Sequence, residues 1–115
     1  MAPTTREIPK SDWRSYFDAF SRDLDDLLAT VEVDGVEVGA QIEAERPVLR
    51  GITYDDGDDI VVIGLDASGE AGEDLERIIY SPQTIFLLTG DGGQMVFDVK
   101  DAEGTQTLVR LEPVG

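Results

Sequence analysis

The chain has 115 residues, with 25 acidic side chains against nine basic ones, and it contains neither histidine nor cysteine. The missing histidine removes the side chain that titrates near neutral pH by default, and the missing cysteine removes thiolate nucleophiles, disulfides and thiolate zinc ligands. The net charge of −16 argues against binding to nucleic acid or to anionic lipid, since both interactions need clustered Lys and Arg side chains.

The start of the chain predicts a flexible arm followed by one amphipathic helix. Residues 1–9 read as the arm, and residues 10–115 as a single domain. Ser11 is the expected N-cap, with Asp12 in the first turn, where the helix dipole favours a negative charge. Apolar side chains then recur at helical spacing over about four turns, and we interpret this stripe as core rather than as a cofactor site. The stripe consists of Trp13, Tyr16, Phe17, Phe20 and Leu24.

From Leu27 onward the apolar period changes from 3.6 to 2, which is typical of strands. Gly51 lies inside one of these segments and predicts a bulge or bend, and Pro82 is expected to end another. Residues 66–74 read as a loop, and residues 75–80 as a helical turn or a short strand. The other strands are expected over residues 27–33, 36–44, 48–54, 59–65, 85–89, 94–100 and 105–111, with turns at 34–35, 55–58, 90–93 and 101–104.

Two strands are apolar on both faces, at residues 60–63 and 85–88, and therefore need cover on both sides. The helix covers one face of the sheet, and a second sheet, barrel closure or another subunit would cover the other. We therefore predict an α+β fold, in which an N-terminal amphipathic helix packs on a curved antiparallel sheet or small open barrel of about six or seven strands.

Carboxylate clusters are the main candidates for chemistry. Asp55, Asp56, Asp58 and Asp59 surround Gly57 and form a candidate site for a hard cation, but they lack the spacing and the flanking helices of an EF-hand, so a plain turn is favoured.

Two further acidic groups have plainer explanations. Glu43 and Glu45 lie about 7 Å apart on one strand face, in the range of paired-carboxylate hydrolysis, yet a solvated face explains them better. Three aspartates at positions 23, 25 and 26 oppose the helix dipole, which indicates that the helix ends there. No serine has a histidine to activate it, and the glycines of residues 90–93 lie in a hairpin rather than before a helix. We therefore predict no catalytic residue, no cofactor and no enzyme activity.

Several segments, taken in order, resemble a family of small bacterial proteins of unknown function. The resemblance implies a compact bacterial cytosolic domain and implies no activity. Members often carry a histidine at about the position of Arg77, which this chain lacks. The segments are TREIP (5–9), TVEVDG (30–35), GAQIEAE (39–45), LRGITYD (49–55), ERIIYSP (76–82) and DAEGTQTLVRL (101–111).

The leading functional hypothesis is a non-catalytic interaction or structural module that self-associates as a homodimer and tolerates salt. One alternative is a small-ligand-binding domain with a cavity between helix and sheet, lined by Trp13, Tyr16 and Tyr54. Another is an acidic DNA-mimic inhibitor. We expect a cytoplasmic protein that binds neither nucleic acid nor membranes, with the identity of any protein partner left open. Salt adaptation and ordinary acidity both account for the charge.

Overall fold

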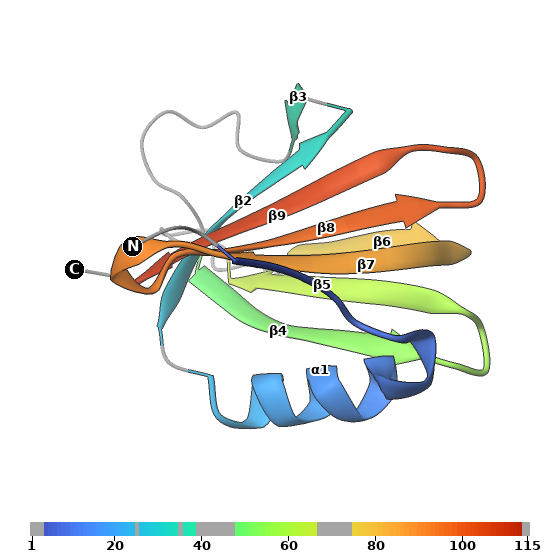
Figure 1. Cartoon of the computed structure of the whole chain (residues 1–115), viewed down its shortest axis with the longest axis horizontal. Coiled ribbons are helices and arrows are strands. Elements are labelled where there is room, and N and C mark those ends of the chain that lie inside the picture. Colours follow the sequence, from blue (N-terminus) through green and yellow to red (C-terminus); the bar gives the residue numbers. More distant parts are fainter. Residues whose placement is uncertain (1–3, 25, 35, 39–47, 67–74, 114–115) are drawn as a thin grey trace.

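The computed structural model describes residues 4–24, 26–34, 36–38, 48–66 and 75–113. Within these residues nine strands form one sheet in the order β1-β7-β8-β9-β2-β4-β5-β6, and β3 pairs with β2. Every pairing is antiparallel, and α1 lies along β4 (Figure 1). The elements are β1 (Thr4–Glu7), the 3-10 turn η1 (Lys10–Asp12), α1 (Trp13–Arg22), β2 (Leu27–Val33), β3 (Val36–Val38), β4 (Val48–Asp55), β5 (Ile60–Asp66), β6 (Leu75–Tyr80), β7 (Pro82–Thr89), the 3-10 turn η2 (Asp91–Gly93), β8 (Met95–Asp101) and β9 (Gln106–Pro113).

A corner at Ser81 shows that the sheet curls. β6 is the last strand in the sheet order and β7 is the second, yet only Ser81 separates them along the chain. Ser81 has a φ of 53°, in the left-handed region, and its backbone N–H donates to the Asp59 carbonyl while its own carbonyl accepts from Ala102. The last strand of the sheet, β6, therefore meets β7, the strand next to the other end, at this corner. The predicted curvature is present, and the ladder of described strands runs from β1 to β6 without a closing pair.

The aromatic stripe of α1 packs into the curled sheet. Trp13 and Phe17 are buried, and the other three members of the stripe pack against the core. Phe17 and Phe20 meet the ring of Phe97 on β8 in edge-to-face contacts, with centroids 5.3 and 5.5 Å apart. The stripe is therefore core, as its spacing predicted.

A β-bulge in β4 fixes the helix on the sheet. The register between β4 and β5 shifts between Leu49 and Gly51, which confirms the irregularity predicted at Gly51. Beside the bulge, the Ser21 hydroxyl of α1 donates to the Ile52 carbonyl at 2.8 Å and accepts from the Ile52 N–H at 2.9 Å. A Cβ on Gly51 would lie 3.2 Å from the Ser21 Oγ, so the absence of a side chain lets the helix approach. Among the described residues β2 pairs with β4 only at Leu28 and Val48, so the Ser21 hydroxyl, rather than a neighbouring strand, bonds the N–H and C=O of Ile52.

Residues 4–9, the described part of the expected arm, differ from that expectation. Thr4–Glu7 form β1, which pairs with β7, and Ile8 is buried, donating its N–H to Ile85. All four side chains of β1 are exposed, so the strand exists through backbone pairing and gives no apolar signal in the sequence. The helix therefore follows a strand, and the sheet is larger than the six or seven strands predicted.

One local prediction also changes. Ser11 is not an N-cap but lies inside η1, because the Asp12 N–H bonds to the Pro9 carbonyl and tightens the turn. Residues 75–80 form a short strand, one of the two alternatives predicted for them. This strand ends at Tyr80, before Pro82, as predicted, and Pro82 itself begins β7, three residues before the expected start of that strand. Of the strand expected over residues 36–44, only Val36–Val38 falls within the described residues.

The two strands predicted to be apolar on both faces each have one buried face and one half-buried face. On β5, Val61 and Ile63 are buried, while Val62 is half-buried. On β7, Ile85 is buried and Phe86 is half-buried. The inner faces thus supply the core, and the outer faces remain only partly covered by the described part of the chain.

Candidate functional site

The ligand pocket predicted from Trp13, Tyr16 and Tyr54 is not assembled as a cavity. The rings of Trp13 and Tyr54 contact each other edge to face, with centroids 5.1 Å apart, and both residues are buried. The indole Nε1 of Trp13 donates to the Ile8 carbonyl at 2.8 Å. The ring of Tyr16 instead contacts those of Phe17 and Phe97. Trp13 and Tyr54 are therefore packing residues, and only Tyr16 borders an open space.

The aspartates predicted as a cation site, at the turn between β4 and β5, bond to separate partners. The Asp55 carboxylate accepts hydrogen bonds from the N–H groups of Gly57 and Asp58, as in an Asx turn. Asp56 pairs with Arg14 at 3.5 Å. The part of the chain that the structure describes contains no cluster of three or more acidic side chains placed to hold a metal ion.

Asp59, the fourth residue of that candidate site, links the turn to the N-terminal segment. Its carboxylate accepts a 2.6 Å hydrogen bond from the Tyr54 hydroxyl and lies 3.4 Å from the Lys10 ammonium, which in turn lies over the Trp13 ring. The hydrogen bond to Asp59, helped by burial, raises the pKa of Tyr54 to about 12. The same hydrogen bond and the Lys10 charge lower the pKa of Asp59. The pKa shifts of Tyr54 and Asp59 thus arise from one set of contacts among Tyr54, Asp59 and Lys10. These contacts hold η1 against the β4–β5 turn.

Some of the remaining acidic candidates lie within the described residues and others lie outside them. Asp23 is the C-cap of α1, and its N–H bonds to the Ala19 carbonyl, so the helix ends where the aspartates predicted. Glu43, Glu45 and Asp25 lie outside the described residues.

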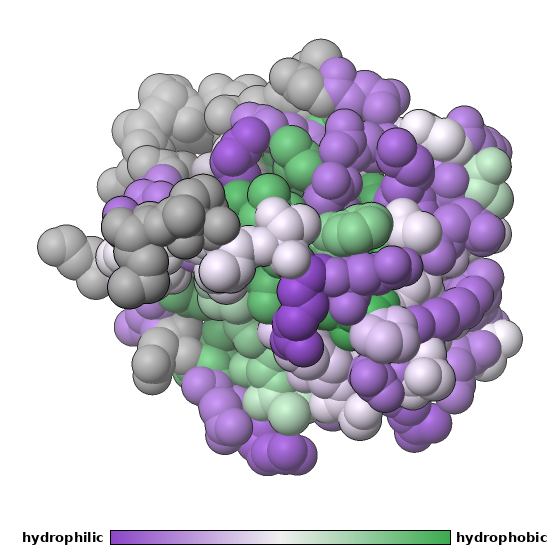
Figure 2. Space-filling view, viewed as in Figure 1, coloured by the Kyte–Doolittle hydropathy of each residue, from purple (hydrophilic) through white to green (hydrophobic). Residues whose placement is uncertain are grey.

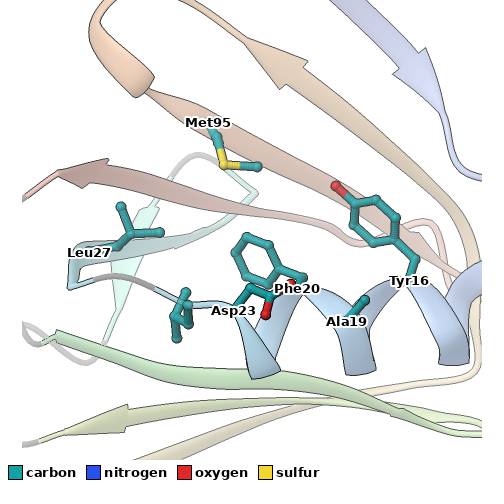
Figure 3. Close-up of a pocket in the computed structure, with 7 residues that line it drawn as sticks. Tyr16, Ala19, Phe20, Asp23, Leu27 and Met95 are labelled. Carbon is teal, nitrogen blue, oxygen red and sulfur yellow. The ribbon is translucent and has the colours of Figure 1, made fainter.

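An apolar groove runs beside the C-terminal half of α1, with a volume of about 440 Å³. It lies between the helix and the first residues of β2 and β8, and Figure 3 shows Met95 and Leu27 across from Phe20. Figure 2 shows apolar side chains at the surface over this end of the helix. The lining residues are Tyr16, Ala19, Phe20, Asp23, Leu24, Leu27 and Met95.

The second notable surface is β6, which ends the sheet. β6 pairs with β5 on one side, and no other described strand pairs with it. Ile78 and Tyr80 project from its outer face and are the large apolar side chains exposed in the described residues, at 42% and 67%. Beside the strand, two hollows of about 340 and 330 Å³ extend to the ends of β2 and β9. Natural proteins usually blunt such edges with charge, twist or cover, so an apolar edge is a candidate interaction surface.

Both surfaces were missed from the sequence for identifiable reasons. Ile78 and Tyr80 alternate with Ile79 in the sequence, but the pattern of residues 75–80 fits a helical turn as well as a short strand. The groove brings together residues about 70 positions apart, and no local pattern joins Met95 to α1.

Comparisons with known proteins support the resemblance seen in the sequence. A family model described as a family of unknown function (DUF5335) matches residues 4–114. An uncharacterized protein of Aquifex aeolicus (strain VF5) is 35% identical over 109 residues, which span 95% of this chain and 93% of the relative. No solved structure matches the chain. Among the described residues, no helix has the length and apolarity to cross a membrane.

Proposed function

The chain belongs to DUF5335, a family of unknown function, and we propose that it is a non-catalytic interaction module that self-associates through β6. The observation that carries the proposal is the exposure of Ile78 and Tyr80 on a strand that ends the sheet. Main-chain groups on such an edge provide affinity for an added strand, and alternate side chains provide specificity.

A second copy of the chain suits this edge because the edge is self-complementary. In an antiparallel pair about a two-fold axis, side chains opposite each other point to the same face. If the two-fold axis passes through Ile78, the Ile78 side chains of the two copies lie opposite each other. If the axis passes through Ile79, Ile78 of each copy lies opposite Tyr80 of the other copy. Either register covers apolar side chains that are exposed in one copy.

Salt should govern this association, because each copy carries a net charge of −16. Two such chains repel each other at low ionic strength, while the Debye length shortens from about 10 Å at 0.1 M to about 3 Å at 1 M salt. Molar salt also strengthens apolar burial when the anion is sulfate. We therefore expect a monomer–dimer equilibrium that moves toward dimer as salt rises.

The test is molar mass by light scattering during gel filtration at 0.1 and 1 M salt, comparing the natural chain with Ile78→Lys. Lysine lowers the net negative charge, so electrostatics alone would strengthen association, whereas an edge lysine blocks strand pairing. Thr53→Lys is the matched control, because Thr53 is exposed on the interior strand β4 and carries the same charge change.

A dimer that Ile78→Lys abolishes and Thr53→Lys retains supports the proposal. A natural chain that stays monomeric at both salt concentrations up to millimolar protein overturns it. A dimer unaffected by Ile78→Lys overturns the assignment to β6. The DNA-mimic alternative has no supporting observation in the described residues and stays a prediction, as does the absence of enzyme activity.

A further inference from the structure

The groove beside α1 has the size and lining of a small-molecule site, and it lies on different strands from the β6 edge. Its volume of about 440 Å³ falls within the roughly 300–1,000 Å³ of known ligand sites. We propose that it binds an amphiphilic organic cation, with the apolar part against Phe20, Leu27 and Met95 and the ammonium group beside Asp23.

The apolar part of the ligand follows from the side chains that face one another across the groove. Phe20, Leu24 and Leu27 are half-buried and pack against the core while keeping surface toward the groove. Met95 closes the opposite side with a flexible thioether, a side chain that adapts to irregular ligands (Figure 3). A bound alkyl chain or ring would take this surface out of water.

The positive charge of the ligand follows from the end of the helix. Asp23 is exposed and caps the C-terminus of α1, where the helix dipole carries a partial negative charge. No lysine or arginine lines the groove among the described residues, so at the Asp23 end an anionic head group would meet a carboxylate. The net charge of −16 also favours a cationic ligand over an anionic one.

The aromatic side chains leave the Asp23 end of the groove for the ammonium group. Tyr16 and Phe20 lie nearly parallel, with an interplanar angle of 8° and centroids 6.5 Å apart. The guanidinium carbon of Arg6 already lies 5.8 Å from the Tyr16 centroid, so one ring of this pair holds a cation. Tyr16 and Asp23 are seven residues apart, or about 10 Å along the helix, so the ammonium group at Asp23 avoids Arg6.

The chain provides a direct reporter for this site. It contains only two methionines, Met1 and Met95, so methyl-labelled methionine gives Met95 its own NMR signal. The probe is octyltrimethylammonium at 0.3 M salt, and octanoate is the anionic counterpart of equal chain length. We expect the Met95 methyl signal to shift saturably with the ammonium probe and much less with octanoate.

Three variants locate the binding. Ala19→Leu extends a half-buried side chain into the groove with a good helix former, and should weaken binding about tenfold or more. Asp23→Asn should weaken it about two- to fivefold, the range for an exposed ion pair. Asp18→Asn is the matched control, since Asp18 is exposed on the same helix and does not line the groove.

A saturable Met95 shift that Asp23→Asn weakens and Asp18→Asn leaves unchanged supports the proposal. Equal loss in both aspartate variants would mean that general charge attracts the probe, and would overturn it. Equal binding of octanoate overturns the charge argument, and undiminished binding to Ala19→Leu overturns the location. Asp23→Asn changes an exposed side chain, so it keeps the test decisive even if Ala19→Leu impairs folding. Dimerisation through β6 is neither required nor tested by these outcomes.

Discussion

Replacing Ser21 by alanine tests the contact that holds α1 on the sheet. The serine hydroxyl makes two hydrogen bonds to the backbone of Ile52, of 2.8 and 2.9 Å, and Ile52 is 1% exposed. In Ser21→Ala both the N–H and the C=O of Ile52 lose this partner. Among the described residues β2 pairs with β4 only at Leu28 and Val48, so no pairing with β2 replaces these two bonds.

The expected loss of stability follows from these two backbone groups. Each buried polar group left without a partner costs about 1–3 kcal/mol. Ser21 is half-buried, so water reaches part of the site, and alanine regains about 0.5 kcal/mol through helix propensity. We therefore expect Ser21→Ala to lower the free energy of unfolding by about 1.5–3 kcal/mol, or the Tm by about 6–12 °C for a chain of this length.

The assay is urea unfolding followed by the fluorescence of Trp13, the single tryptophan, which is buried in the native state. Measurements at one protein concentration and one salt concentration keep any self-association constant. Ser15→Ala is the control, since Ser15 lies on the same helix, is exposed, and donates a single 3.2 Å hydrogen bond to Asp12. It should change stability by less than about 0.5 kcal/mol. If Ser21→Ala behaves like Ser15→Ala, the Ser21 hydroxyl does not hold the helix on the bulge.

Further predictions test the bulge, the tyrosine network and the sheet edge. Gly51→Ala should lower the free energy of unfolding by about 1 kcal/mol, because the added Cβ lies 3.2 Å from the Ser21 Oγ. The loss should be smaller when Ser21 is already replaced by alanine. If the losses of the two single variants simply add up in the double variant, as measured by urea unfolding, this contact is contradicted. Tyr54 should ionise near pH 12 in an ultraviolet titration, so its contribution to stability is full below pH 10 and is lost as the pH rises toward 12. The variant Asp59→Asn should return the pKa of Tyr54 toward 10. An unchanged pKa in that variant would count against the hydrogen bond to Asp59 as the cause of the shift. Ile78→Cys introduces the only cysteine of the chain, and pairing centred on this residue should give a disulfide-linked dimer under mild oxidation; a dimer in solution that never cross-links would exclude that register.

The sequence alone determined most of the local elements. The alternation of apolar residues placed β2 at its observed bounds and β4, β5, β8 and β9 within two residues of theirs. Turn chemistry was equally informative: Asp34 adopts a φ of 52° in the predicted hairpin, and Gly104 a φ of 84° in the last one. These features depend on steric and hydrogen-bonding preferences of a few neighbouring residues, which the sequence displays directly.

Only the tertiary structure decided the features that depend on distant partners. β1 has four exposed side chains and exists because β7 offers an unpaired edge. Ser21 lies outside the apolar stripe predicted for the helix, and its role appears only when β4 brings the Ile52 backbone beside it. The groove likewise requires Met95 to be brought beside α1. In each case the stabilising contact joins backbone groups or side chains that are far apart in the chain. A local sequence pattern cannot predict which distant groups will come into contact.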